Sequence, residues 1–130
     1  MLTPNQAQQY TFRKNERLCG KKRIEQLFNS ESRSLSAYPL RAVYRLEERD
    51  GMPAEILVSV SKKHLRHAVD RNRVKRLVRE AYRLNKHILW QALEDQHIAL
   101  ALLWISDELA NYDTVERKVR NLLQRISEEL

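Results

Sequence analysis

The segment HIALALLWI, residues 97–105, restricts the fold of this chain more than any other, because it is almost continuously apolar. Taken alone, such a run fits either a buried helix or a buried strand. The polar residues on both sides of it and its Ile and Trp content favour a strand. A strand in which polar and apolar residues do not alternate is typical of one that is covered on both faces. The segment therefore predicts a long strand that is buried on both faces.

Two other segments have the pattern of strands. Apolar residues alternate with other types through 39–47, which is typical of a half-exposed strand, and through 55–61, where they share one face. Asp50 and Gly51 form the tight point of a turn between these segments, so we expect the two strands to pair as a hairpin. Residues 31–38 are compatible with a loop or with a short edge strand.

Helical periodicity appears in three places. We expect a short amphipathic helix within residues 20–29, a basic helix at 70–86, and a final helix at 113–130, where Asp113 and Glu116 resemble a capping box. The order is helix, two or three strands, helix, strand, helix. This order predicts an α/β sandwich in which the helices pack on one sheet.

The length of 130 residues and the apolar content of 42% predict one domain, residues 1–130, in which the polar residues 1–11 form a mobile tail. No segment approaches the roughly 18 apolar residues of a transmembrane helix, and no apolar core of a secretory signal is visible at the start. A single cysteine, Cys19, excludes internal disulfide bonds and fits a reducing compartment. We therefore expect a cytoplasmic protein without a membrane or a disulfide-linked partner.

Positive charge is concentrated in one part of the chain. The whole sequence has 24 Lys and Arg against 17 Asp and Glu, a net charge of +7. Residues 61–87 alone hold ten Lys and Arg against Asp70 and Glu80, which is a net charge of +8. A small domain with this charge usually binds a polyanion, either a nucleic acid or an anionic membrane surface. The segment 61–87 is the expected binding site.

The expected basic helix has two different sides when it is plotted at about 100° per residue. Asp70 is its expected N-cap. Like charges three and four residues apart repel each other, and bound phosphates would turn this repulsion into attraction. The apolar side holds Val74, Leu77, Val78, Ala81, Tyr82, Leu84 and Asn85, and the cationic side holds Asn72, Lys75, Arg76, Arg79, Arg83 and Lys86.

This helix has three alternative roles besides RNA binding. It could be rich in arginine only for solubility. A membrane-surface helix needs an apolar face that is free to enter lipid, and this apolar stripe is better used against a sheet. A helix-turn-helix needs two adjacent short helices, whereas a strand precedes this one. Because arginine binds phosphates through two parallel hydrogen bonds and stacks on bases, RNA of defined shape is the favoured partner.

The sequence ILVSVSKK…AVDRNRVKRLVREAYR, within residues 56–83, resembles the signature of the protein subunit of bacterial ribonuclease P. The sequence FRKNERL…IEQLF, within residues 12–28, is similar to the N-terminal region of that family, and the likeness extends over residues 12–127. It implies an α+β two-layer sandwich with a four-stranded sheet, like the second domain of ribosomal protein S5, with a left-handed βαβ crossover. General topology rules alone predict a right-handed crossover.

The resemblance also implies a function. The holoenzyme of this family removes the 5′ leader from precursor tRNA, with Mg²⁺ bound mainly through the RNA subunit and the substrate. The RNA performs the chemistry, so no catalytic residue is expected in the polypeptide. The expected partners are ribonuclease P RNA and precursor tRNA. The resemblance assigns contact with the catalytic RNA to Arg71, Asn72, Arg73, Lys75, Arg76 and Arg79. We expect Lys62, Lys63 and Arg83 to bind RNA as well.

The resemblance further implies a cleft, between a face of the sheet and the helices, that holds the single-stranded leader. Phe28, Tyr44 and Ile24 are its expected residues, since aromatic faces stack on bases of any sequence. Core packing is the alternative role of Phe28 and Tyr44. Ile24 stands where the family often has an aromatic residue. The segment HLRH, residues 64–67, is one residue longer than usual and lacks the usual glycine.

No nucleotide-binding, metalloprotease or serine-hydrolase motif occurs in the sequence. The four histidines lack the spacing of a zinc site, and the acidic residues Asp107, Glu108 and Asp113 fit solvated helix ends. The main rival function is an RNA-binding protein of the ribosome or its assembly, without a role in cleavage. A protein-only nuclease is a third possibility, and it would need a cluster of carboxylates that bind a metal.

Overall fold

The computed structural model describes residues 12, 14–29, 31–47 and 53–130. The expected tail at 1–11 and the expected turn at Asp50 and Gly51 lie outside these residues. The elements are η1 (Lys14–Glu16), α2 (Lys21–Leu27), β1 (Arg33–Ala37), β2 (Leu40–Glu47), β3 (Ala54–Val60), α3 (Ala68–Leu93), β4 (His97–Trp104) and α4 (Tyr112–Glu129).

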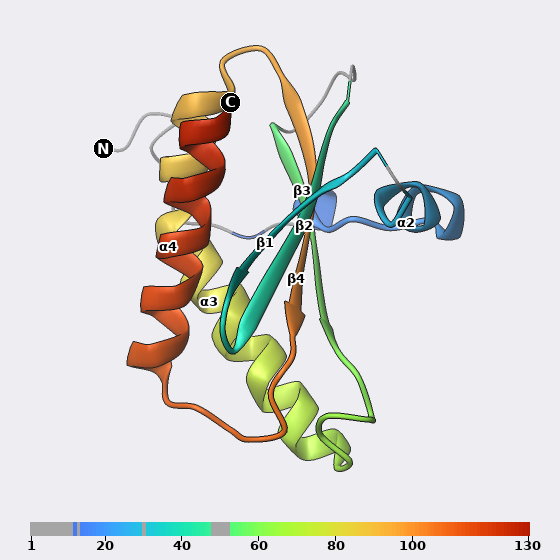
Figure 1. Ribbon diagram of the computed structural model, residues 1–130, viewed down its shortest axis with the longest axis vertical. Helices are drawn as coiled ribbons and strands as arrows, with labels where there is room; N and C mark the ends of the chain where they lie inside the picture. The colour runs from blue at the N-terminus through green and yellow to red at the C-terminus, as the bar shows by residue number, and fades with distance from the viewer. Residues whose placement is uncertain (1–11, 13, 30, 48–52) are drawn as a thin grey trace.

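The strands form one mixed sheet in the order β1-β2-β4-β3 (Figure 1). Strand β2 is antiparallel to β1 and β4, and β3 is parallel to β4. The expected hairpin between 39–47 and 55–61 is therefore wrong, because β4 lies between β2 and β3. The apolar run takes an interior position, where both of its edges are hydrogen-bonded and both of its faces can be covered.

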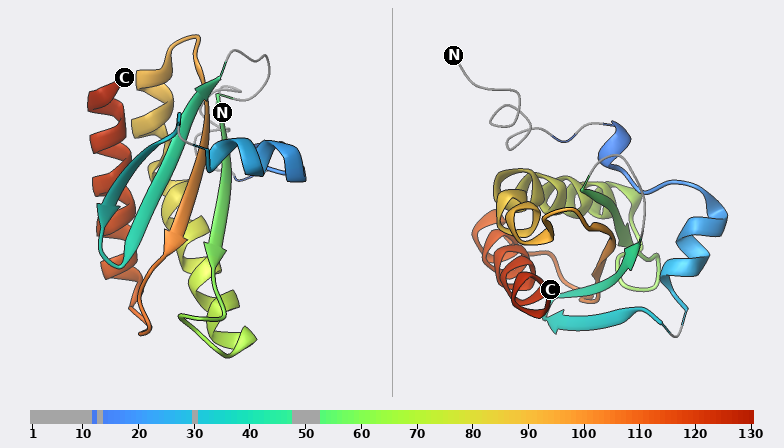
Figure 2. Two further views of the ribbon diagram at one scale, coloured as in Figure 1. Left: turned by 45° about the vertical axis from the view of Figure 1, so that its right-hand side comes forward. Right: turned by 90° about the horizontal axis from the view of Figure 1, so that it is seen from above.

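The crossover β3–α3–β4 is left-handed, as the family resemblance implies. In the view from above (Figure 2), both parallel strands run away from the viewer, and the chain turns anticlockwise from β3 through α3 to β4. This is the opposite of the common handedness. The crossover brings α3 back over the sheet beside α4.

Helices α3 and α4 cover one face of the sheet, and the short helix α2 packs on the other (Figures 1 and 2). Alternate residues of β4 face each side: Leu100 and Leu102 belong to the core under α3 and α4, whereas Ala99 and Ala101 belong to a second core under α2. Val43, on the side of β2 expected to be exposed, is buried in this second core. The predicted two-layer sandwich is confirmed, and α2 explains why β4 is apolar on both faces.

The helix boundaries differ from the expected ones in two informative ways. Helix α3 continues to Leu93, because Leu89 and Leu93 extend its buried stripe. It also begins before Asp70, and His67 is its N-cap, without a side-chain hydrogen bond. None of the helices in the described part of the chain is long and apolar enough to cross a membrane.

The expected capping box of the last helix is also wrong. The side chain of Asn111 caps α4 by accepting a hydrogen bond from the backbone N–H of Thr114, at 2.9 Å. Glu116 instead accepts hydrogen bonds from Asn85 of α3 and from Arg120. The carboxylate that the pattern assigned to the cap thus joins the two long helices.

Candidate nucleic-acid interface

The N-terminal half of α3 presents cations because its apolar residues are used against the sheet. Val74, Val78 and Ala81 are fully buried in the core. Of the residues between them, Leu77 packs partly against the same core, whereas Lys75, Arg76 and Arg79 are exposed or half-buried. This cationic surface of α3 consists of Asn72, Arg73, Lys75, Arg76 and Arg79.

The loop between β3 and α3 adds cations at the same end of the molecule. Lys62, Lys63 and Arg66 are exposed in this loop, which lies at the lower end of the view beside the start of α3 (Figure 1). Leu65 is buried in the core and fixes the middle of the loop. The loop also rests on the segment after β4, since Nδ1 of His64 lies 2.9 Å from a carboxylate oxygen of Asp107.

The predicted cations differ in how far the protein itself neutralises them. Within the described ranges, no Asp or Glu forms a salt bridge with Arg73, Lys75, Arg76 or Arg79. Arg83 is different, because its guanidinium holds Glu80 through bonds of 3.0 and 2.5 Å and lowers the pKa of that carboxyl. The charge left over for a partner is therefore greatest in the first turns of α3.

The expected division of α3 into two sides is wrong at its border. Lys86, expected on the cationic side, is fully buried and forms an ion pair with Glu16, with its Nζ also 4.4 Å from the ring centroid of Trp90. Leu84, expected on the apolar side, is exposed. Both residues lie near the edge of the predicted stripes, and the N-terminal segment that crosses α3 shifts this edge.

Arg71 binds backbone carbonyl groups, whereas Arg83 binds a carboxylate. Its Nη1 donates hydrogen bonds to the carbonyl oxygens of Leu65, at 3.0 Å, and Arg66, at 2.7 Å. These carbonyl groups belong to the loop before α3. One nitrogen of the Arg71 guanidinium is thus engaged by the backbone.

Arg17 is a cation beside this surface that the spacing and charge of the sequence did not indicate. Its backbone forms a bridge with Ile56 at the outer edge of β3, and Leu18 donates to the Ile56 carbonyl at 2.9 Å. Burial, and then the positive charge of Arg17, lower the pKa of Arg79. Only the likeness of the N-terminal segment to the family could have indicated Arg17, because its position depends on a pairing with a distant strand.

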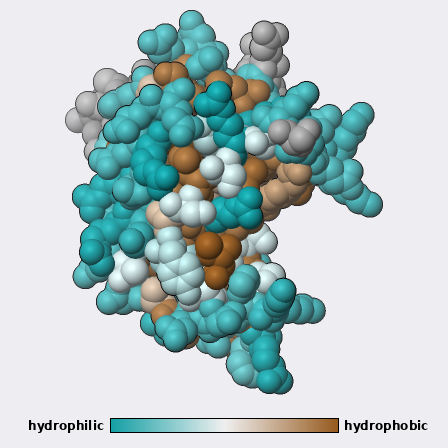
Figure 3. All heavy atoms as spheres, viewed as in Figure 1, coloured by the Kyte–Doolittle hydropathy of each residue, from teal (hydrophilic) through white to brown (hydrophobic). Residues whose placement is uncertain are grey.

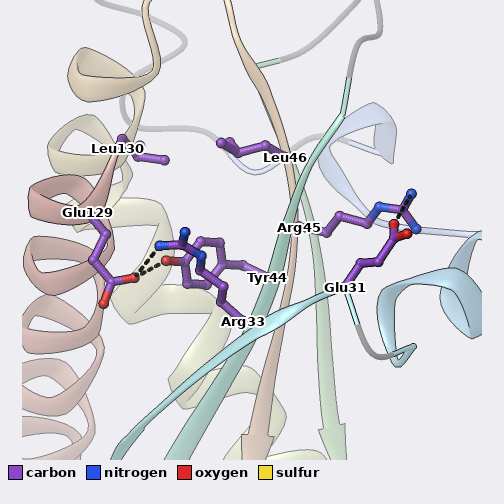
Figure 4. Close-up of a pocket in the computed structure, with 7 residues that line it drawn as sticks. All are labelled: Glu31, Arg33, Tyr44, Arg45, Leu46, Glu129 and Leu130. Carbon is purple, nitrogen blue, oxygen red and sulfur yellow. Dashed lines mark hydrogen bonds and ion pairs between the residues drawn. The ribbon is translucent and has the colours of Figure 1, made fainter.

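The three residues expected in the leader cleft lie on two different faces of the sheet. Ile24 and Phe28 belong to α2 and its C-terminal end, and Phe28 is 47% exposed. Tyr44 points to the opposite face, toward Glu129 at the end of α4, whereas the next residue, Arg45, points toward Glu31 (Figure 4). The structure therefore does not bring Tyr44 together with Phe28.

Tyr44 is almost completely buried, with 3% of its surface exposed. Its hydroxyl donates a hydrogen bond to Glu129, and Arg33 lies 3.9 Å from the same carboxylate. Burial, followed by the bond to Glu129, raises the pKa of Tyr44 to about 12. These residues line a pocket of about 330 Å³. The ring of Tyr44 is packed in the core, which is the alternative that the sequence left open for it.

The face on the α2 side offers a different surface. Ile24, Leu57 and Leu103 are partly buried around the second core. In Figure 3 the outline of the molecule is hollowed below α2, above the loop that leads into α3. Charged groups hold α2 over this face, since Arg23 binds Glu55 at 2.6 Å and Glu47 at 3.0 Å.

Comparisons with known proteins identify the family that this chain resembles. Residues 12–127 match the family model described as Ribonuclease P. The ribonuclease P protein component of Porphyromonas gingivalis is 49% identical over 117 residues, which cover 88% of this chain and 85% of the relative. That of Chlorobaculum tepidum is 34% identical over 118 residues, covering 82% and 77%.

Solved structures show the same fold. The RNase P protein from Thermotoga maritima has a TM-score of 0.67 at 27% identity and covers 85% of this chain and 96% of its own. The RNase P protein of Staphylococcus aureus has a TM-score of 0.67 at 17% identity, over 87% of this chain and 96% of its own.

Proposed function

Because the chain belongs to the ribonuclease P protein family, we propose that it binds the 5′ leader of precursor tRNA together with the catalytic RNA and assists Mg²⁺-dependent removal of the leader. As a ribonuclease P protein component it is one part of a holoenzyme that processes tRNA, and it associates there with the RNA subunit. The observation that carries the proposal is the cationic surface of α3.

The cationic surface of α3 is proposed to bind RNA phosphates by electrostatic attraction. A cation that has no acidic partner in the protein is free to exchange its counterions for phosphates. Each phosphate contact steepens the salt dependence of binding by roughly 0.7 to 0.9 in log–log slope. Arg73, Arg76 and Arg79 are our main candidates, and Arg17 extends their surface toward the N-terminus. Arg83 contributes less, because Glu80 already pairs with it.

The leader is assigned to the face of the sheet beside α2. A single strand without defined sequence needs apolar or aromatic surface for its bases and cations for its backbone. Phe28 offers an exposed ring, Leu103 offers apolar surface, and Arg41 and Arg45 project from the same side of β2 as the buried Val43. Ile24 contributes surface at the edge of α2. Tyr44 supports this strand from the opposite face and is not assigned to the leader.

The metal ion is assigned mainly to the RNA and the substrate. Across the residues that the structure describes, no group of three or more His, Cys, Asp or Glu side chains is placed to hold a metal ion. Mg²⁺ takes oxygen ligands and is commonly held by phosphates and water. When bound, it activates water and stabilises the charge that develops at phosphorus. The protein's own contribution is to bind phosphates and to hold the leader.

A reconstitution experiment tests the proposal. The protein is mixed with a bacterial ribonuclease P RNA and precursor tRNA at low Mg²⁺, and release of the leader is measured against mixtures that lack the protein or the RNA. We expect the protein to stimulate cleavage only when the RNA is present. Cleavage by the protein alone would favour a protein-only nuclease, and the absence of any stimulation would favour a binding protein of the ribosome.

A further inference from the structure

The loop between β3 and α3 carries three exposed cations but no glycine or proline that would restrict its backbone. Its shape is instead set by contacts. The amides of His64 and Leu65 donate to the carbonyl of Ser61, at 3.2 and 3.1 Å, and form a turn. The carbonyl groups of Leu65 and Arg66 point to the guanidinium of Arg71, one turn into α3.

We propose that Arg71 is a positioning residue, which binds these two carbonyl groups and thereby holds Lys62, Lys63 and Arg66 against the RNA. This inference rests on the proposed function, because it assigns the loop cations to the same RNA interface. It differs from the direct RNA contact that the family resemblance implies for Arg71.

The chemistry of the side chain supports this role. A guanidinium presents five N–H donors in a fixed plane, so one nitrogen can bind two neighbouring carbonyl groups while the others stay available. A cation at the first turn of a helix meets the positive end of the helix dipole. The two carbonyl oxygens offset this repulsion, because they bring partial negative charge to Nη1.

The position of the contact between Arg71 and the two carbonyl groups explains how it holds the loop in place. Leu65 is anchored in the core, and His64 is held by Asp107, so the loop is fixed on its inner side. Arg71 fixes the next two peptide groups, through the carbonyl oxygens of Leu65 and Arg66. The cations on the outer side, Lys62, Lys63 and Arg66, are then presented in one arrangement beside the cationic surface of α3.

Arg71→Lys tests the proposal, because it keeps the charge but shortens the side chain and removes the planar group. In the free protein, we expect hydrogen exchange at the His64 and Leu65 amides to become about tenfold faster, while exchange at Val78 and Leu100 is unchanged. Arg73→Lys is the matched control in this measurement. Unchanged exchange at His64 and Leu65 in Arg71→Lys would overturn the proposal.

Binding to a bacterial ribonuclease P RNA provides the second readout. We expect Arg71→Lys to flatten the salt dependence by about 1.5 in log–log slope, which corresponds to about two lost phosphate contacts. In a protein that already carries Lys62→Ala, Lys63→Ala and Arg66→Ala, the same change should have no further effect on the affinity or the slope. An equal further loss of affinity there would show that the planar guanidinium of Arg71 contacts the RNA directly and would contradict the proposal.

The two readouts separate this inference from the proposed function. If the exchange result is as expected but Lys62→Ala, Lys63→Ala and Arg66→Ala together leave RNA binding unchanged, then the loop is not part of the interface and the inference fails as stated. If removal of the arginines of α3 also leaves RNA binding unchanged, the proposed function fails with it.

Discussion

Glu16 and Lys86 form an ion pair whose two side chains are fully buried, although they lie 70 positions apart in the sequence. Glu16 ends the short helix η1, and Lys86 lies in the second half of α3. The pair fixes the N-terminal segment across α3. Because Arg17 follows directly, the same contact determines where that cation is presented.

Breaking this pair should destabilise the fold. Glu16→Gln leaves the ammonium of Lys86 buried without its counter-charge, which typically lowers the free energy of unfolding by about 3 to 5 kcal/mol. Chemical denaturation measures the change, with the exposed Glu25→Gln as the matched control. The double variant Glu16→Leu with Lys86→Met should recover most of the loss, since it removes both charges of the pair. A loss for Glu16→Gln that is no larger than for the control would contradict this account.

Tyr44 should ionise only at high pH. Its pKa is raised to about 12, by burial and then by the bond to Glu129, whereas a free tyrosine ionises near 10. The folded state favours the neutral phenol, so this stability is fully present below about pH 10 and is lost as the pH rises toward 12. Ultraviolet difference titration measures the ionisation, and Tyr44→Phe identifies its contribution. Ionisation of Tyr44 near pH 10, as in a free tyrosine, would contradict the burial of its side chain.

Phe28→Ala should weaken the binding of precursor tRNA to the reconstituted holoenzyme without weakening the binding of leaderless tRNA. Removal of one stacking ring typically costs about 1 to 3 kcal/mol, which is about five- to 150-fold in affinity. Tyr44→Phe is the control on the opposite face of the sheet, and it should affect both substrates alike. Equal losses for the two substrates in Phe28→Ala would remove Phe28 from the leader site.

Asn111→Ala should lower the free energy of unfolding by about 1 kcal/mol, because it removes the side-chain bond to the amide of Thr114. The capping box expected from the sequence gives a different result, in which Asp113→Ala has the larger effect. Thermal unfolding of the two variants distinguishes these cases. The structure predicts the larger effect for Asn111→Ala.

Local patterns in the sequence identify most of the elements. The apolar run at 97–105 indicates β4, and the periodicity of 113–130 indicates α4, because each depends only on spacing within one segment. The order of the strands in the sheet depends instead on which segments pair with each other. Adjacency along the chain suggested a hairpin of β2 and β3, but β4 lies between them and pairs with both.

The composition of the candidate interface is predictable, but its geometry is not. Helical spacing places Arg76 and Arg79 on one side of α3. It does not show that Lys86 turns inward to Glu16, since this partner is remote in the sequence. Nor can spacing show that Arg71 binds the loop carbonyls, because the bond depends on how Leu65 enters the core.

The salt dependence of RNA binding tests the central claim most directly. The affinity of the protein for a bacterial ribonuclease P RNA is measured over a range of salt concentrations for the wild type, for Arg76→Ala with Arg79→Ala, and for the control Arg117→Ala on the exposed side of α4. We expect the double variant to bind more weakly with a log–log slope flatter by about 1.5, and Arg117→Ala to match the wild type. An unchanged affinity and slope in a folded double variant would contradict the account.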